Sequence, residues 1–316
     1  MRLVSQHHPI TFALLVFLLG FLLLTGCNSL RNEVDPGQLG LESSKLVVSS
    51  FLCPQDTLLT VKVTRSNTVV GDSISLLQPG NTVTNATVTL SEGDRSVVLP
   101  YYKVRPSADS AYSISTKLLP IIAGHTYKLT VVTANGQQAT STCTIPQPVD
   151  PGLIKFSSLT EQSRTQLKRY FVQVQWLDPA GQTNAYQVAG IFRYTTTTNV
   201  REENYNSLSF DDENRGLFPD VGVDGDTIVS GRAFLTPVSS TGNQQTDFYS
   251  QYNTASVTVN LLSIDQSYYR YQEAIIRQRR SRGNPFAEPV LIPSNIEGGL
   301  GCFAGYNNAT LTLKLK

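Results

Sequence analysis

The first half of the chain carries short runs in which apolar and polar residues alternate, the period of half-buried β-strands. The alternation is clean at Val61 and Val63, and again at Tyr127 and Leu129. Seven such runs, rich in Val, Thr and Leu, predict strands at residues 45–52, 58–65, 86–91, 95–99, 112–116, 127–133 and 139–145. Seven short strands separated by turn signals favour an immunoglobulin-like β-sandwich over residues 45–146.

Turn residues divide this half from the next. Asn135-Gly136 joins two of the runs and is the strongest hairpin signal in the chain, because a type I′ turn needs positive φ at both positions. Repeated proline, including Pro148 and Pro151, then predicts a linker over residues 147–152, since proline cannot donate to a strand ladder.

The second half resumes as strands and ends with one helix. Strand runs occur at residues 154–158, 170–177, 186–194, 228–235, 255–262 and 309–315. Residues 195–227 are polar and acidic with few apolar anchors, which predicts a long irregular loop. The fold class is therefore mainly β: the N-terminal immunoglobulin-like β-sandwich is followed by a second β-rich domain, residues 153–316, with one C-terminal amphipathic helix.

That helix is predicted over residues 264–280. Ser263 and Gln266 have the spacing of a capping box, and the arginines between Arg277 and Arg282 suit the negative end of the helix dipole. An apolar stripe at i, i+4, i+7 and i+11 consists of Ile264, Tyr268, Tyr271 and Ile275. We expect this stripe to pack on the sheet of the second domain.

The N-terminus has the pattern of a lipoprotein signal peptide. An apolar run from Ile10 to Leu24 follows Arg2 and leads into Leu-Thr-Gly-Cys27. This predicts a signal peptide over residues 1–26, an acylated Cys27 and a tether over residues 27–44. The alternative is a short transmembrane anchor, although the run is short for a membrane span.

Charge narrows the classes of partner. Removing residues 1–26 removes Arg2 and no acidic residue, so 25 basic and 24 acidic residues become 24 of each. A neutral mature chain argues against nucleic acid or anionic lipid as the main partner.

Three cysteines remain besides Cys27. We expect a disulfide between Cys53 and Cys143, because the first and last strands of such a sandwich can be neighbours; the alternative is two separate buried thiols. In the chain-entropy model such a bridge contributes roughly 4–5 kcal/mol. Cys302 lies among apolar residues and is expected to be a buried small hydrophobe.

Few residues offer catalytic or metal-binding chemistry. The mature chain has one histidine, His125, which excludes a histidine-rich zinc site. Three aspartates in one turn, Asp220, Asp224 and Asp226, carry oxygens that calcium accepts, but surface turns also collect Asp for backbone reasons. Two glutamates, Glu288 and Glu297, are a conceivable glycosidase acid–base pair; the alternative is that the stretch around them is structural. We predict no metal, no cofactor and no enzymatic activity.

Residues 268–271 of the predicted helix and three further stretches resemble a known family. Residues 284–289, Asn-Pro-Phe-Ala-Glu-Pro, and residues 294–301, Ser-Asn-Ile-Glu-Gly-Gly-Leu-Gly, follow the helix, and residues 44–50 provide a second match near the N-terminus. The pattern resembles the Bacteroidota lipoprotein family known as domain of unknown function 4249; Cys302 departs from it. The resemblance implies an outer-membrane lipoprotein encoded beside a TonB-dependent transporter.

We therefore expect a lipid-anchored outer-membrane accessory or binding protein, the partner of a TonB-dependent transporter in substrate capture or uptake. The alternatives are a structural or adhesive surface lipoprotein and a carboxylate-dependent glycan hydrolase. Proline and glycine restrict the loop of residues 284–301, which suits a docking surface, with Phe286 and Ile296 as candidate docking residues. The competing interpretation is that this loop only closes the fold.

Overall fold

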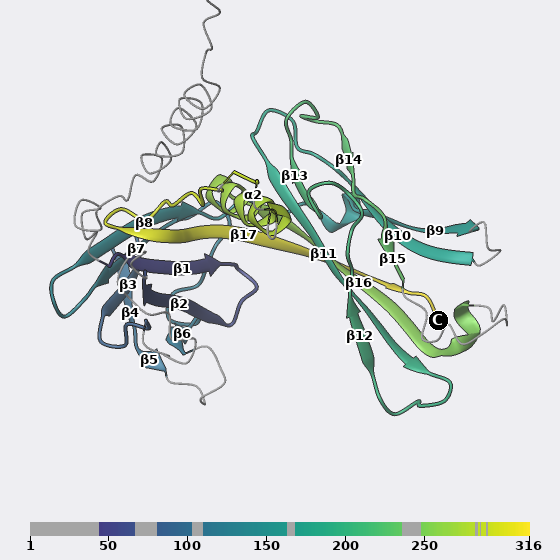
Figure 1. Ribbon diagram of the computed structural model, residues 1–316, viewed down its shortest axis with the longest axis horizontal. Coiled ribbons are helices and arrows are strands. Elements are labelled where there is room, and N and C mark those ends of the chain that lie inside the picture. The colour runs from purple at the N-terminus through teal and green to yellow at the C-terminus, as the bar shows by residue number, and fades with distance from the viewer. Residues whose placement is uncertain are drawn as a thin grey trace, which may run out of the picture. The chain divides into compact units, whose positions relative to one another are not determined.

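The computed structural model describes residues 44–66, 81–102, 110–162, 168–235, 248–281, 284, 286–288 and 290–316. These residues form mainly β-structure with one α-helix near the C-terminus, as Figure 1 shows. The expected mainly β fold class is confirmed. The predicted signal peptide, the acylated Cys27 and nearly all of the tether lie outside the described residues.

All seven strands predicted for the first half are present, with bounds that shift by at most a residue or two. They are β1 (Leu46–Leu52), β2 (Leu58–Arg65), β3 (Thr87–Glu92), β4 (Arg95–Leu99), β6 (Ala111–Ser115), β7 (Thr126–Val132) and β8 (Gln138–Thr144), with the two-residue strand β5 (Tyr101–Tyr102) in addition. In β2, buried and exposed residues alternate as the sequence period requires.

Two sheets enclose the core of this first half. The order β1-β2-β6-β5 forms one of them, and β4-β3-β7-β8 forms the other. Both sheets contribute to one buried cluster, which includes Val48, Val61, Leu90 and Tyr127. The immunoglobulin-like topology stays a prediction, but the two-sheet core follows from the alternation in the sequence.

The second half contains more strands than the sequence indicated. Its elements are η2 (Pro151–Leu153), β9 (Lys155–Gln162), β10 (Lys168–Leu177), β11 (Ala185–Thr196), β12 (Asn204–Ser207), β13 (Leu217–Pro219), β14 (Thr227–Val229), β15 (Ala233–Phe234), η3 (Phe248–Gln251), β16 (Tyr252–Ile264), α2 (Gln266–Ser281) and β17 (Gly299–Lys314). The expectation that residues 195–227 form one irregular loop was partly wrong, because two short strands within them, β12 and β13, pair with β11. The predicted strand 228–235 is instead two strands, interrupted where the Ser230 hydroxyl accepts the Val174 N–H at 3.0 Å.

Strand β17 joins the two halves of the chain into one sheet. Its first part pairs in parallel with β1, from Leu46 opposite Gly299 to Leu52 opposite Gly305. Its second part pairs antiparallel with β16, from Ile264 opposite Tyr306 onward. The resulting nine-stranded sheet has the order β12-β11-β16-β17-β1-β2-β6-β5, with β13 as a ninth strand that pairs with β11; β17 is the yellow arrow in Figure 1.

The predicted strand 309–315 covers only the second part of β17, because glycine in the first part looks like a loop. Gly301 has φ +117°, and a Cβ there would lie 1.9 Å from the Val48 carbonyl oxygen. Glycine is therefore required where β17 approaches the backbone of β1.

The structure refines the predictions for one turn and for the linker. The hairpin between β7 and β8 forms, but within it only Gly136 has positive φ, so the turn is not type I′. The Gly136 N–H donates to the Thr133 oxygen at 2.9 Å, which is the pattern of a longer hairpin loop with glycine in the left-handed conformation. The predicted linker, residues 147–152, is packed, since Val149 is buried in the second core. Just before it, the Pro146 oxygen accepts a hydrogen bond from Asn307 Nδ2 at 3.0 Å.

Candidate binding site at the C-terminal helix

Helix α2 begins two residues later than predicted and uses a different cap. Ser263 and Ile264 belong to β16, so the proposed capping box does not form. Asp265 is the cap: one carboxylate oxygen accepts the Tyr268 N–H at 2.7 Å, and the other accepts the Gly305 N–H at 2.6 Å. Burial raises the pKa of the Asp265 carboxyl, and the backbone N–H donors oppose that rise.

The helix packs over strands of both halves of the chain. The Tyr268 ring lies edge-on to Phe51 of β1, with ring centroids 5.2 Å apart, and 5.9 Å from the Tyr306 ring of β17. The Tyr268 hydroxyl donates to Gln187 Oε1 of β11 at 2.8 Å. Tyr271 contacts the same Phe51 ring at 6.2 Å. Part of the predicted stripe therefore packs as expected, but β1 of the first half shares the contact.

The segment after α2 starts with a local turn, and its end is tied to β17 and β8. At its start, Asn284 forms a turn, in which its side-chain oxygen accepts the Phe286 N–H at 3.0 Å. At its end, the side chain of Asn295 bonds both backbone groups of Phe303, as donor at 2.6 Å and as acceptor at 3.0 Å. Glu297 then makes a two-way backbone bridge to Thr140 of β8. We call the apolar surface of Phe286 and Leu291 on this segment the ridge.

The two residues of the ridge are among the most exposed apolar side chains that the structure describes. Phe286 is 93% exposed and Leu291 is 90% exposed. Ile296, the other candidate docking residue, is only 6% exposed and belongs to the first core. The expectation for Ile296 was therefore wrong: it faces inward because the backbone bridge at Glu297 draws its neighbour against β8.

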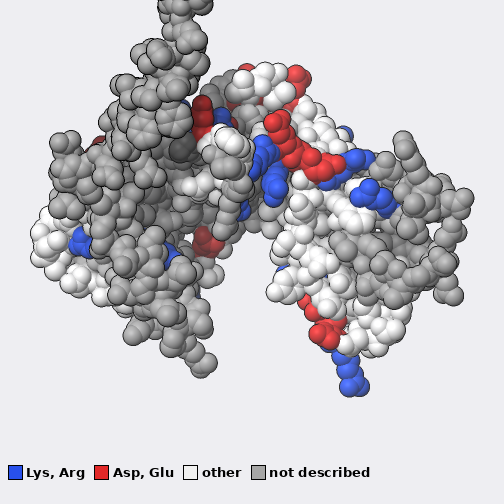
Figure 2. All heavy atoms as spheres, viewed as in Figure 1, with Lys and Arg blue, Asp and Glu red and all other residues white. Residues whose placement is uncertain are grey.

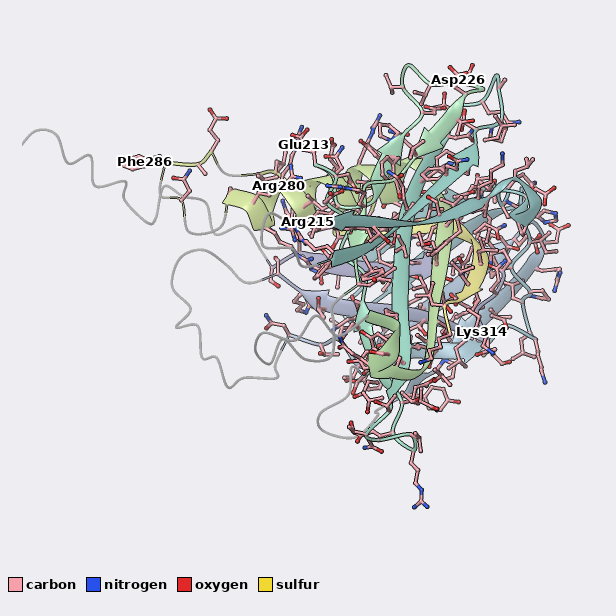
Figure 3. The ribbon with its side chains drawn as sticks, turned by 90° about the vertical axis from the view of Figure 1, so that its right-hand side faces the viewer. Glu213, Arg215, Asp226, Arg280, Phe286 and Lys314 are labelled. Carbon is pink, nitrogen blue, oxygen red and sulfur yellow. The ribbon has the colours of Figure 1, made fainter. Side chains whose placement is uncertain are left out.

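A pocket lies between the last turns of α2 and the loop before β13. Its volume is about 280 Å³. The helix provides one wall and the loop provides the other: Glu273, Ile276, Arg277 and Arg280 face Glu213, Asn214 and Leu217. Figure 3 shows Glu213, Arg215 and Arg280 gathered near this helix, whereas Phe286 projects away from them.

The loop wall of the pocket is fixed by its backbone. The Asp212 carboxylate accepts the Gly216 N–H at 2.8 and 3.0 Å. Arg215 has φ +52°, the one positive φ outside glycine among the described residues. Gly216 has φ +85°, and a Cβ there would lie 2.5 Å from the Val188 oxygen of β11. Contact with β11 thus holds a backbone conformation that costs about 1–2 kcal/mol for a residue such as arginine.

The pocket carries charge of both signs. Arg277 and Glu273 approach to 4.0 Å, a long contact between partly exposed side chains that contributes little to stability. Neither Arg280 nor Glu213 has an ion-pair partner within the described part of the chain. Below these groups, Leu217 is buried and Ile276 is half-buried. Figure 2 likewise shows acidic and basic side chains intermixed on the visible face.

The model of a domain of unknown function, DUF4249, matches residues 31–312. The chain belongs to this family. None of the curated proteins matches the chain. Within the described residues of this DUF4249 protein, no helix has the length and apolar character needed to cross a membrane.

Two of the three turn aspartates of this DUF4249 protein accept backbone N–H groups. Asp220 accepts the Asn184 N–H at 2.5 Å, and Asp224 accepts the Gly181 N–H at 2.8 Å. Nearby, buried Asp178 accepts the Tyr186 hydroxyl at 2.5 Å. These hydrogen bonds fit the turn interpretation for Asp220 and Asp224. Over the described residues, no group of three or more His, Cys, Asp or Glu side chains has a metal-binding arrangement.

The three cysteines described here are free thiols, so the expected Cys53–Cys143 disulfide is not formed. Strand β1 has β2 and β17 as neighbours, whereas β8 lies at the edge of the opposite sheet, so the first and last strands are not adjacent. Cys302 is buried, as expected, and its Sγ lies 3.8 Å from the Ser267 oxygen. Burial raises the pKa of Cys143 and that of Cys302, the latter to about 12.

The remaining candidates lie apart from the pocket. His125 is bonded to Glu92 on the surface of the first half. Glu288 and Glu297 are exposed, and neither lines the pocket. Sequence reasoning missed Glu213 and Leu217, because it treated residues 195–227 as one loop. The apolar pair Leu217-Phe218 inside that acidic stretch was the available signal.

Proposed function

We propose that this protein is a lipid-anchored outer-membrane accessory or binding protein, which docks on a TonB-dependent transporter and assists substrate capture or uptake. The observation that carries the proposal is the exposure of Phe286 and Leu291 on a segment whose end is tied to β17 by Asn295. Family membership and the lipoprotein pattern at Cys27 support it.

The energetics of the ridge suit a docking surface. Burying a phenylalanine or leucine side chain contributes roughly 1.5–3 kcal/mol each, and this contribution is unused while the ridge faces water. The hydrogen bonds of Asn295 to Phe303 fix one end of the segment before binding, so ordering the segment on a partner costs less entropy. Large apolar residues exposed on such a segment are therefore better explained by a partner than by the stability of the free protein.

The tether restricts where this partner can be. Residues 28–43 connect the predicted anchor at Cys27 to the described chain, and when fully extended they span at most roughly 55–60 Å. A protein held this close to a membrane meets membrane-embedded partners at high effective concentration. An outer-membrane transporter meets this condition, whereas a freely diffusing protein gains nothing from the anchor.

The test is affinity purification of the full chain from membranes with Phe286→Ala and Leu291→Ala combined. We expect copurification of a protein with the size of an outer-membrane transporter to be lost or reduced at least tenfold. The melting temperature of the double variant should stay within about 2 °C of wild type, because truncating exposed side chains changes stability little. Val221→Ala is the matched control: Val221 is 83% exposed and lies in the turn before β14. Undiminished copurification with the double variant, or equal loss with the control, would contradict the proposal.

A further inference from the structure

We propose that the pocket between α2 and the loop before β13 binds a small zwitterion, a dipeptide with both termini free. Arg280 would bind the ligand carboxylate and Glu213 the ligand ammonium group. This goes beyond the docking role, and its test requires only the purified protein.

The charges of the pocket select this class of ligand. Arg277 and Arg280 project from α2, while Glu273 and Glu213 place carboxylates on the same pocket. A polyanion would meet two carboxylates and a polycation would meet two guanidinium groups, so each is opposed by part of the lining. A ligand with one charge of each sign satisfies Arg280 and Glu213, which have no ion pair with each other or with any other described residue.

The geometry of arginine adds to this selection. A guanidinium group can donate two parallel hydrogen bonds to one carboxylate, which sets the orientation of the ligand as well as its affinity. Asn214, on the loop wall, offers both a donor and an acceptor beside Glu213. The two ends of a zwitterion are therefore recognised by opposite walls, the helix and the loop.

Size limits the ligand further. A volume of about 280 Å³ is just below the range for small-molecule sites, roughly 300–1,000 Å³, so the ligand must be small. Most of the exposed lining is polar, and Leu217 and Ile276 supply only a small apolar part. The charged termini of the ligand are therefore the groups to vary, and Leu-Leu, whose side chains are uncharged, is a suitable probe.

The pocket wall is organised before any ligand arrives. The Asp212–Gly216 hydrogen bonds and the close approach of Gly216 to Val188 hold the loop on β11. The opposite wall belongs to a helix whose Tyr268 is bonded to Gln187 of the same strand. Both walls of the pocket are thus held by contacts with β11. Because the walls are already ordered, less conformational entropy is lost when a ligand binds.

The inference is tested by isothermal titration calorimetry of the purified full chain. The ligands are Leu-Leu, its N-acetyl form and its C-terminal amide. We expect Leu-Leu to bind and each blocked form to bind at least tenfold more weakly. Because the charged groups are exposed, the affinity of Leu-Leu should also fall as salt is raised. Absence of Leu-Leu binding, or equal binding of all three ligands, would overturn the inference.

Two variants assign the ends of the ligand. Arg280→Gln should weaken Leu-Leu at least tenfold and remove the preference for a free carboxylate, while Glu213→Gln should remove the preference for a free ammonium group. Arg279→Gln is the matched control, because Arg279 lies in the same helical turn but does not line the pocket. Equal losses in Arg279→Gln and Arg280→Gln would show that only general charge matters, contrary to the proposal. The ridge double variant should bind Leu-Leu normally, so failure of docking and failure of ligand binding are distinguishable.

Discussion

Asn295→Ala is the most informative single change for the fold. Phe303 lies in the part of β17 that pairs with β1 on one side, and pairing with β16 begins only at Tyr306. On the other side, the Asn295 side chain takes the place of a neighbouring strand, since it bonds both the N–H and the carbonyl oxygen of Phe303. Phe303 is fully buried, so the two backbone groups lose their partners without full access to water.

The magnitude follows from these two bonds. A buried donor or acceptor left unsatisfied costs about 1–3 kcal/mol, so two of them reduce the free energy of unfolding by roughly 2–6 kcal/mol. For a chain of this size, a loss of about 3 kcal/mol lowers the melting temperature by roughly 6–12 °C.

Urea unfolding followed by tryptophan fluorescence and far-ultraviolet circular dichroism measures this loss in the purified protein. Asn253→Ala serves as the control, because Asn253 is exposed and its side chain makes one hydrogen bond among the described residues, to Thr195 at 3.3 Å. We expect the control to change stability by less than about 0.5 kcal/mol. If Asn295→Ala were as stable as this control, Asn295 would not be closing the edge of β17.

Two further predictions concern titratable groups. Because burial raises the folded-state pKa of Asp265, its contribution is most favourable below the unfolded value, about 4, and is lost as pH rises through the folded value. Urea unfolding across pH should therefore show wild type losing stability relative to Asp265→Asn from about pH 4 upward; a constant difference would contradict the shift. The thiols of Cys53, Cys143 and Cys302 are buried and have raised pKa values. Iodoacetamide at pH 8 should therefore leave these thiols unmodified in the native protein and label all three after unfolding without reductant. Two thiols that remain unlabelled after unfolding would indicate a disulfide.

The strands were predictable where one face is buried. In β2, Leu59, Val61 and Val63 are buried and the residues between them are not. The alternation of apolar and polar residues in the sequence is therefore enough to predict this strand. Strand pairing could not be predicted in this way, because it joins residues that are far apart in the sequence. The parallel pairing of β1 with β17 places Leu46 opposite Gly299, and no local period contains that information.

The candidate site was only partly predictable for the same reason. The arginine-rich end of α2 is visible in the sequence, but its facing wall comes from Glu213 and Leu217, more than 60 residues earlier. That wall exists because β13 pairs with the start of β11, which places the loop before β13 against the helix. The missing disulfide has a similar origin, because sequence order made β1 and β8 look adjacent when the topology separates them.

The segment of residues 284–301 has two parts that contact the rest of the fold differently. Asn295, Ile296, Gly298 and Gly301 are committed internally: they bond, pack against or closely approach β8, β1 and β17. A side chain that already has an internal partner cannot be offered to another protein without destabilising the fold. The interpretation that the loop closes the fold therefore holds for residues 295–301. Only the earlier part of the segment, with Phe286 and Leu291, is left for a partner, so we place the docking surface there.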